Sequence, residues 1–293
     1  MSLFIRLFQR FCDNLLVNTA KRSTIASRRE AISKRLNKDF WGVDTTSGAF
    51  YVGSYGRNTA NGWISDIDMA FEMPPSLYYK YDAWTSNGQS AFLQEVKNSI
   101  ARTYYNTSLK ADGQIIEVVF SDNMKFEVLP VFENKAGSYT FADSNNGGSW
   151  KTTNPKPEIQ AIKDGDALTN NNLRNLCRMT RAWANYCSVP IKGILIDTLA
   201  YRFLTNWSNC HQSYLYYDFM SRDFFEYLKN QSENQTSWYA IGSGQLITNY
   251  GNFRSKAKTA YNLSLEAIEY DNKGYEYSSK QKWREIYGTR FPN

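Results

Sequence analysis

The sequence contains only one histidine, His211, in 293 residues. Serine and cysteine nucleophiles are usually activated by a histidine, and zinc sites usually combine histidine with paired cysteines. The four cysteines, Cys12, Cys177, Cys187 and Cys210, form no C-x-x-C pair. The composition therefore argues against a zinc site and against histidine-dependent catalysis. It favours buried, reduced thiols in a cytoplasmic protein.

Long apolar runs are also missing, because no stretch approaches the roughly 20 residues of a membrane span. The start, Met1 to Phe11, carries charges inside its apolar run and has no small-residue cleavage site. It predicts an amphipathic helix that packs on the protein body rather than a signal peptide, and we expect no membrane partner. The net charge of +6 from 34 basic and 28 acidic residues is too small to require a nucleic acid.

Hydrophobic residues make up 42% of the chain and aromatic residues 16%, which predicts an ordered protein with a substantial core. The expected strands come first and the expected helices second, which is typical of an α+β lobe followed by a helical lobe. We place the two domains at residues 1–155 and 156–293. The predicted strands are 49–54, 64–72, 115–120 and 125–132. The predicted helices are 3–17, 24–40, 90–106, 173–184, 194–203, 213–229, 252–270 and 278–287, with 133–157 a loop or linker and 230–251 a polar loop.

Two short patterns lie close together in the first lobe. Gly53-Ser54 predicts a turn whose backbone N–H groups and hydroxyl can hold phosphate oxygens. Asp66 and Asp68 are two residues apart in a predicted strand, so both side chains point to one face. Two carboxylates on one face repel unless a cation lies between them, and Mg²⁺ prefers oxygen ligands. Alone, each pattern is more often a simple turn or a solvated face; together they indicate a site for a nucleoside triphosphate.

A third carboxylate, Glu127, lies in the middle of a later predicted strand. Phe126 and Val128 share the opposite face of that strand, so Glu127 needs a cation, a metal or a hydrogen-bond network as its partner. An ion pair with a lysine or arginine is the alternative explanation. With Asp66 and Asp68 it would complete a two-metal site for in-line displacement, with Glu127 on the metal near the acceptor hydroxyl.

These residues carry a resemblance. Gly53-Ser54, Ser65 to Asp68 and Phe126 to Val128 follow the pattern of the DNA polymerase β-like nucleotidyltransferase superfamily. The fuller string from Gly53 through Arg57-Asn58-Thr59 to Met69 looks most like the CD-NTases, the cyclic GMP–AMP synthase/DncV-like nucleotidyltransferases. Arg178 to Trp183 and the ending Trp283 to Pro292 are similar to later parts of that family.

The resemblance implies a polymerase β-like nucleotidyltransferase core, with a mixed β-sheet and flanking helices, and a C-terminal helical lobe that closes the active-site cleft. It implies a monomeric enzyme that uses two Mg²⁺ or Mn²⁺ ions to make a cyclic di- or trinucleotide second messenger from nucleoside triphosphates such as ATP and GTP. The product would act on a separate effector protein in bacterial anti-phage (CBASS) signalling. No obligatory nucleic acid is implied, because strong basic patches and a zinc insertion are missing from the sequence.

The chain departs from the family pattern at three places. Glu127 stands where many members have aspartate, Arg181 where relatives often have lysine, and Lys192-Gly193 replaces a common Lys-Ser. Arg181 and Lys192 are candidates for triphosphate binding, with ordinary surface roles as the alternative. A linear oligonucleotide synthase, a small-molecule nucleotidyltransferase and an inactive nucleotide sensor are the competing functions. The sensor is disfavoured because all three carboxylates are retained.

Overall fold

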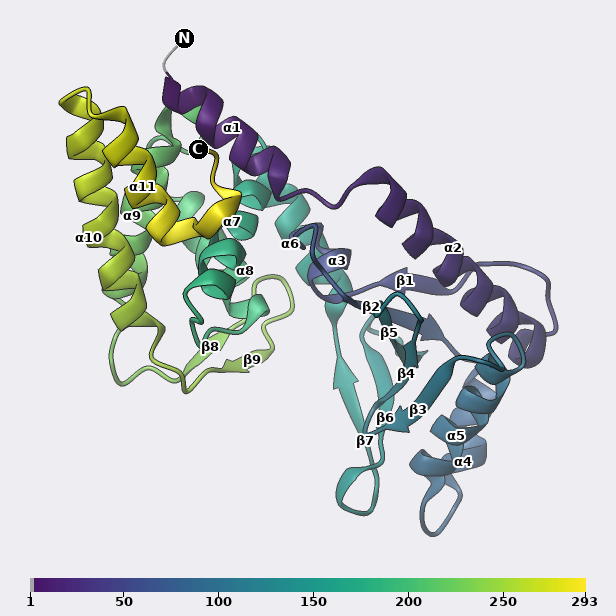
Figure 1. Ribbon diagram of the computed structural model, residues 1–293. Helices are drawn as coiled ribbons and strands as arrows, with labels where there is room; N and C mark the ends of the chain where they lie inside the picture. The colour runs from purple at the N-terminus through teal and green to yellow at the C-terminus, as the bar shows by residue number, and fades with distance from the viewer. Residues whose placement is uncertain (1–2) are drawn as a thin grey trace. The chain divides into compact units, whose positions relative to one another are not determined.

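The computed structural model describes residues 3–293, which form two compact units (Figure 1). The sheet unit consists of residues 18–56 and 63–156, and the helical unit of residues up to 17, 57–62 and 157–293. The sequence divided the chain once, between residues 155 and 156. The structure also divides it near 156, but it assigns the amino-terminal helix and the short segment 57–62 to the helical unit.

The sheet unit is built on a mixed seven-stranded sheet in the order β1-β2-β5-β4-β3, with β6 pairing with both β5 and β7. Only the β2–β5 pair is parallel. The strands are β1 Ala49–Tyr51, β2 Asp66–Glu72, β3 Ser108–Asp112, β4 Ile115–Val119, β5 Lys125–Glu133, β6 Tyr139–Asp143 and β7 Ser149–Thr153. The α+β class with a mixed sheet and flanking helices is confirmed.

Helices cover one face of this sheet. Figure 1 shows α2 (Thr19–Leu36), α4 (Pro75–Asp82) and α5 (Gly88–Ala101) on the same side of the strands. Residues 66–69 of β2 and 125–128 of β5 alternate between buried apolar and exposed or partly exposed charged side chains, because successive residues of a strand point to opposite faces. The buried set packs under the helices, and the polar set lies on the other face.

The prediction that residues 133–157 are a loop or linker is wrong. Strands β6 and β7 form a hairpin there, and Tyr139 and Phe141 pack with Ala70 and Val131 in a small core. Asn145–Gly147 is the tight turn of the hairpin, a 3₁₀ segment. Proline and glycine mark turns without saying whether strands flank them, and the short, half-exposed strand β7 gives little apolar signal.

The sequence did not predict several further elements. One is helix α6 (Pro155–Leu168), whose first residues fall in the predicted linker, and the others are short. Helix α4 begins directly at Pro75, a position where the missing N–H of proline has no consequence. Strand β3 alternates between exposed and partly exposed residues and has no buried one. Strands β8 (Ser237–Tyr239) and β9 (Leu246–Thr248) form a small hairpin inside the predicted polar loop 230–251.

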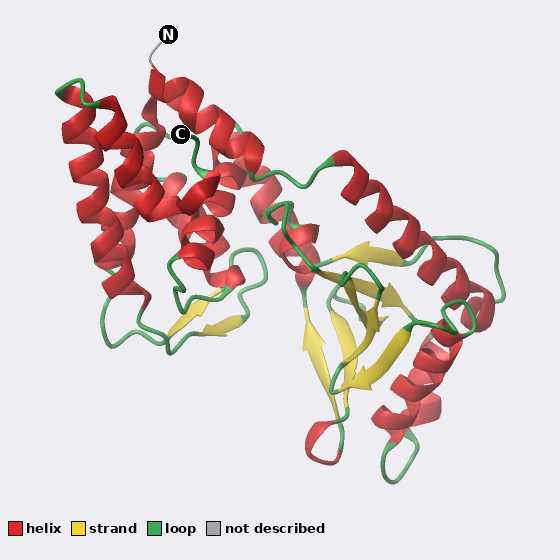
Figure 2. Ribbon diagram, in the orientation of Figure 1, coloured by secondary structure: helices red, strands yellow, loops and turns green. Residues whose placement is uncertain are grey.

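The helical unit consists of helices and the small β8–β9 hairpin (Figure 2). Its helices are α1 Leu3–Asn14, α6 Pro155–Leu168, whose first two residues belong to the sheet unit, α7 Asn172–Tyr186, α8 Gly193–Leu204, α9 Tyr217–Lys229, α10 Phe253–Asn272 and α11 Glu276–Tyr287. Short helical turns of the chain are the π-helix Asn37–Trp41, α3 Gly53–Gly56 and the 3₁₀ turns Tyr214–Tyr216 and Gly288–Arg290. Among the described residues, no helix has both the length and the apolar character needed to span a membrane.

An aromatic cluster joins the two ends of the chain within the helical unit. The ring of Phe8 on α1 lies 5.2 Å from those of Trp283 and Phe291, and the ring of Phe11 lies 4.8 Å from that of Tyr287. Edge-to-face and tilted contacts at these distances stabilise a core beyond the area they bury. The expectation that the amphipathic amino-terminal helix packs on the protein body is confirmed for Leu3–Asn14, since Phe8 and Phe11 are buried; Met1 and Ser2 lie outside the described residues.

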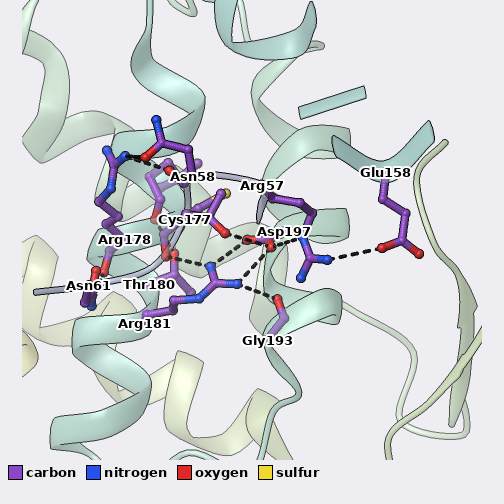
Figure 3. A network of polar contacts seen from close by, with 12 residues as sticks. Arg57, Asn58, Asn61, Glu158, Cys177, Arg178, Thr180, Arg181, Gly193 and Asp197 are labelled. Atoms are coloured by element: carbon purple, nitrogen blue, oxygen red, sulfur yellow. Dashed lines mark hydrogen bonds and ion pairs between the residues drawn. The ribbon is translucent and has the colours of Figure 1, made fainter. Parts of the chain in front are cut away.

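A buried ion network holds segment 57–62 inside the helical unit (Figure 3). Asp197 of α8 is fully buried and receives hydrogen bonds from Arg57 Nε at 2.8 Å and Thr59 Oγ1 at 3.0 Å. Arg181 of α7 donates to both carboxylate oxygens of Asp197, at 2.5 and 2.8 Å. Arg57 Nη1 also donates a hydrogen bond to Glu158 Oε2 at 3.1 Å.

Burial alone would raise the pKa of Asp197, but the charges of Arg181 and Arg57 outweigh it and hold this pKa well below its usual range. Folding therefore depends on an ionised Asp197, since two arginines would otherwise be left facing a neutral group. Removing one partner of a buried ion pair costs far more than an exposed pair contributes.

We expect Asp197→Asn to lower the free energy of unfolding by about 3–5 kcal/mol, because Arg57 and Arg181 lose their shared counter-charge. Denaturant unfolding at pH 7 measures this. The pKa of Asp197 is depressed in the folded state, so its contribution is present above the unfolded value of about 4 and declines as the pH falls below that value. The variant should lack this part of the acid dependence.

Asp164→Asn is the matched control, because Asp164 is an exposed residue of the same unit whose carboxylate accepts from Gln160. It should change stability by no more than about 0.5 kcal/mol. Equal effects of the two variants would contradict a special role for Asp197.

Candidate active site

Acidic side chains form a row on the sheet face opposite α2, α4 and α5, beside the small core to which Ala70 and Val131 contribute. Asp68 of β2 is in register with Glu127 of β5, and Glu127 is in register with Glu117 of β4. Asp66 lies two residues before Asp68 and therefore on the same face. The structure thus brings the three predicted carboxylates together on two adjacent parallel strands, and it adds Glu117 on a third.

Lys125 lies among these carboxylates. Its Nζ atom is 2.8 Å from Glu127 Oε1, 3.3 Å from Glu117 Oε2 and 3.4 Å from Asp66 Oδ1. The hydrogen bond to Glu127, helped by the charges of Glu127 and Asp66 against a smaller effect of burial, raises the pKa of Lys125 above its usual range. Lys125 is therefore positively charged at neutral pH. It is the cationic partner that we expected for Glu127, a carboxylate in an otherwise apolar strand.

The Gly-Ser turn lies directly against this face. The N–H of Val52, at the end of β1, donates to the carbonyl of Asp68 at 3.0 Å, and the chain then turns into α3 at Gly53. Gly53 has a φ of +59°, and a Cβ atom there would overlap the carboxylate of Asp68. The position thus requires glycine both for its backbone conformation and for its close approach to an acidic side chain. Ser54 follows and is partly exposed.

The donor set fits a hard divalent cation, because Asp66, Asp68 and Glu127 offer only oxygen ligands on one face. In the part of the chain that the structure describes, no three acidic, histidine or cysteine side chains already surround one point as metal ligands. The Lys125 ammonium contacts three of the carboxylates instead. The carboxylates can hold Mg²⁺ or Mn²⁺ once their contacts with Lys125 are rearranged.

The two predicted basic residues lie in the helical unit. Arg181 is committed to Asp197 and to the carbonyl of Gly193, 3.0 Å away, and only 13% of its side chain is exposed. Lys192 directly precedes α8 and is exposed, with its Nζ atom 3.5 Å from Thr248 Oγ1. The geometry leaves Lys192 more available than Arg181 for an anionic ligand.

Comparison with known proteins places the chain in a family. Residues 1–165 match the model of the Second Messenger Oligonucleotide or Dinucleotide Synthetase domain, SMODS. The chain belongs to the SMODS family. A probable cyclic nucleotide synthase of Bacillus cereus (strain VD146) is 25% identical over 179 residues, which are 57% of this chain and 52% of that protein. The matching segment thus spans about half the length of this curated relative.

Solved structures share the SMODS chain's fold. CdnC from E. coli MS115-1, in complex with HORMA-deltaN, superposes with a TM-score of 0.72 at 14% identity and covers 99% of both chains. The Vibrio cholerae DncV cyclic AMP–GMP synthase, bound to the linear intermediate 5′ pppA(3′,5′)pG, gives 0.72 at 14% identity over 96% of this chain and 94% of that one. The resemblance to the CD-NTases drawn from the sequence motifs is confirmed.

Sequence reasoning missed two residues on the acidic face of this SMODS chain, Lys125 and Glu117. Glu117 interrupts the apolar strand Ile115–Val119 just as Glu127 interrupts the next strand, and that alternation was visible. Lys125 lies two residues before Glu127, which puts both on one face. What the sequence could not supply was the register that sets Glu117 opposite Glu127.

If the acidic face carries out nucleotidyl transfer, as proposed below, Gly53→Ala should reduce this activity by roughly 100-fold or more, because the new methyl group must displace the Asp68 carboxylate. Initial rates of nucleotide incorporation measure the effect. Gly137→Ala is the control, since Gly137 also has a positive φ of +78° but no atom within 4 Å of its Cβ position. Both variants should lose about 1–2 kcal/mol of stability from backbone strain, and equal activities would contradict the proposed contact.

Proposed function

We propose that this chain is a metal-dependent nucleotidyltransferase that makes a cyclic di- or trinucleotide from nucleoside triphosphates. The observation that carries the proposal is the placement of Asp66, Asp68 and Glu127 on adjacent strands beside the Gly53-Ser54 turn. Membership of the SMODS family supports it, as does the cyclic nucleotide synthase activity ascribed to the Bacillus relative.

Each residue has a role in this proposal. The Gly53 backbone and the Ser54 hydroxyl hold the triphosphate, and Asp66 and Asp68 hold the divalent ions that accompany it. Glu127 would complete the ligands of the ion near the acceptor hydroxyl. Two divalent ions, when bound, supply a lowered pKa for the attacking hydroxyl and charge neutralisation on the transferring phosphate. The protein then acts chiefly by positioning and electrostatics.

Cyclisation requires one transfer, with release of pyrophosphate, for each nucleotide of the ring: two for a dinucleotide and three for a trinucleotide. Under this proposal all of them take place at the same carboxylates. The linear intermediate bound to the Vibrio synthase is consistent with successive transfers for that protein. We extend the proposal to signalling: a monomeric, cytoplasmic enzyme would release the cyclic nucleotide to a separate effector protein in anti-phage defence.

We expect purified protein with four nucleoside triphosphates and Mg²⁺ or Mn²⁺ to give a nuclease-resistant cyclic product, identified by mass spectrometry. Asp66→Ala/Asp68→Ala should lower its formation by at least about 1,000-fold, since the ions lose their ligands. The control is Asp44→Ala/Asp112→Ala, which removes two exposed carboxylates from the same unit, 69% and 61% exposed.

Identical product profiles from wild type and Asp66→Ala/Asp68→Ala would refute the assignment. A linear product would indicate an oligonucleotide synthase, and a nucleotidylated small molecule would indicate a modifying enzyme of the same superfamily. Nucleotide binding without any product would indicate an inactive sensor.

We expect Lys192 to contribute to triphosphate binding and Arg181 to contribute to the stability of the fold. Lys192→Ala should weaken triphosphate binding by about three- to tenfold without changing the melting temperature, because an exposed charge is lost. Arg181→Ala should lower the melting temperature strongly, because Asp197 stays buried with fewer counter-charges. Isothermal titration and thermal unfolding measure the two effects, with the exposed Lys258→Ala as control. Unchanged triphosphate affinity in Lys192→Ala would remove this residue from the site.

A further inference from the structure

Lys125 contacts carboxylate oxygens that a bound metal ion would also need as ligands. Its ammonium lies 2.8 Å from Glu127 Oε1 and 3.4 Å from Asp66 Oδ1, and both residues are proposed metal ligands. A divalent ion on the same oxygens would come within a few ångströms of this charge. Two cations at that distance repel, and the half-buried surroundings screen them less than bulk water does.

The order of the strands gives Lys125 an alternative ion-pair partner, Glu117 of β4. Strand β5 lies between β2, which carries Asp66, and β4, which carries Glu117. Lys125 Nζ therefore contacts carboxylates on both sides of its own strand, with Glu117 Oε2 3.3 Å away on the side opposite β2. A rotation of the lysine side chain toward β4 would release Asp66 and keep an ion pair with Glu117.

On the premise of the proposed function that this face binds divalent ions, we propose that Lys125 and Glu117 form an internal switch that sets the metal affinity. In the metal-free protein Lys125 contacts Asp66 and Glu127 as well as Glu117. When a divalent ion binds there, Lys125 leaves Asp66 and Glu127 and keeps Glu117. Lys125 thus competes with the metal, and Glu117 favours the metal by accepting the lysine; both are positioning residues.

The test measures Mn²⁺ binding to the purified full chain without nucleotide, by the loss of the free-ion signal in electron paramagnetic resonance. We expect Lys125→Met to bind Mn²⁺ about tenfold more tightly than wild type, because a like charge has left the site. Lys80→Met is the control for net charge, since Lys80 pairs with Glu95 on α5 of the same unit. It should stay within about twofold of wild type.

Affinity in Lys125→Met equal to or below that of wild type, or an equal gain in Lys80→Met, would overturn the proposal. Lys125→Gln serves as a second variant, and circular dichroism checks that each variant is folded. Both substitutions remove the charge, so Lys125→Gln must also bind Mn²⁺ more tightly than wild type, and it replaces Lys125→Met in the test if Lys125→Met does not fold.

A double-mutant cycle tests Glu117. Glu117→Gln alone should weaken Mn²⁺ binding, because Lys125 loses its alternative partner and stays on Asp66 and Glu127. In the Lys125→Met background the same substitution should have a clearly smaller effect, since only the long-range attraction of Glu117 remains to be lost. Equal fold-changes in the two backgrounds would overturn the switch.

Failure of the switch is distinguishable from failure of the proposed function. If Asp66→Ala/Asp68→Ala binds Mn²⁺ as well as wild type, the metal site itself is misplaced. If that variant loses Mn²⁺ binding while Lys125→Met leaves it unchanged, only the switch is refuted.

Discussion

Repulsion between carboxylates is the constraint around which the sheet unit is built. The parallel pairing of β2 with β5 sets Asp68 beside Glu127, and the antiparallel pairing of β5 with β4 sets Glu127 beside Glu117. Like charges on neighbouring strands destabilise a sheet, so this register needs a cation nearby. Lys125 supplies one from within the same strand. The sheet can therefore form without metal, and the carboxylates are already aligned when a metal arrives.

The Gly-Ser motif is continuous in sequence but is held by two different sets of contacts. Gly53 is fixed in the sheet unit by the β1–β2 pairing and by its closeness to Asp68. From Arg57 onward the same loop is fixed in the helical unit by the buried Asp197. Each half of the motif is thus held within its own unit, and only the first half touches the acidic face.

The sequence was sufficient for the parts of this architecture that depend on local periodicity. The alternation of Ile67 and Met69 with Asp66 and Asp68 predicted both a strand and a shared acidic face, and the fold class followed from the order of elements. It was insufficient where structure depends on pairing between distant segments. Residues 133–157 were predicted to be a linker because turn-forming residues dominate the segment, although it forms a hairpin. The role of Asp197 could not be predicted from its apolar helix, because its partners Arg57 and Arg181 lie on other segments.

The charge of the acidic face bears on how a triphosphate would approach it. Asp66, Asp68, Glu117 and Glu127 contribute four negative charges and Lys125 one positive charge, which leaves a formal charge of −3 on a protein whose net charge is +6. A bare triphosphate is itself strongly anionic and would be repelled there. Under the proposed function, divalent ions are thus needed first for binding and only then for chemistry. Because the carboxylates attract the ion while Lys125 opposes it, the face would favour a triphosphate that brings its own metal over a metal that arrives alone.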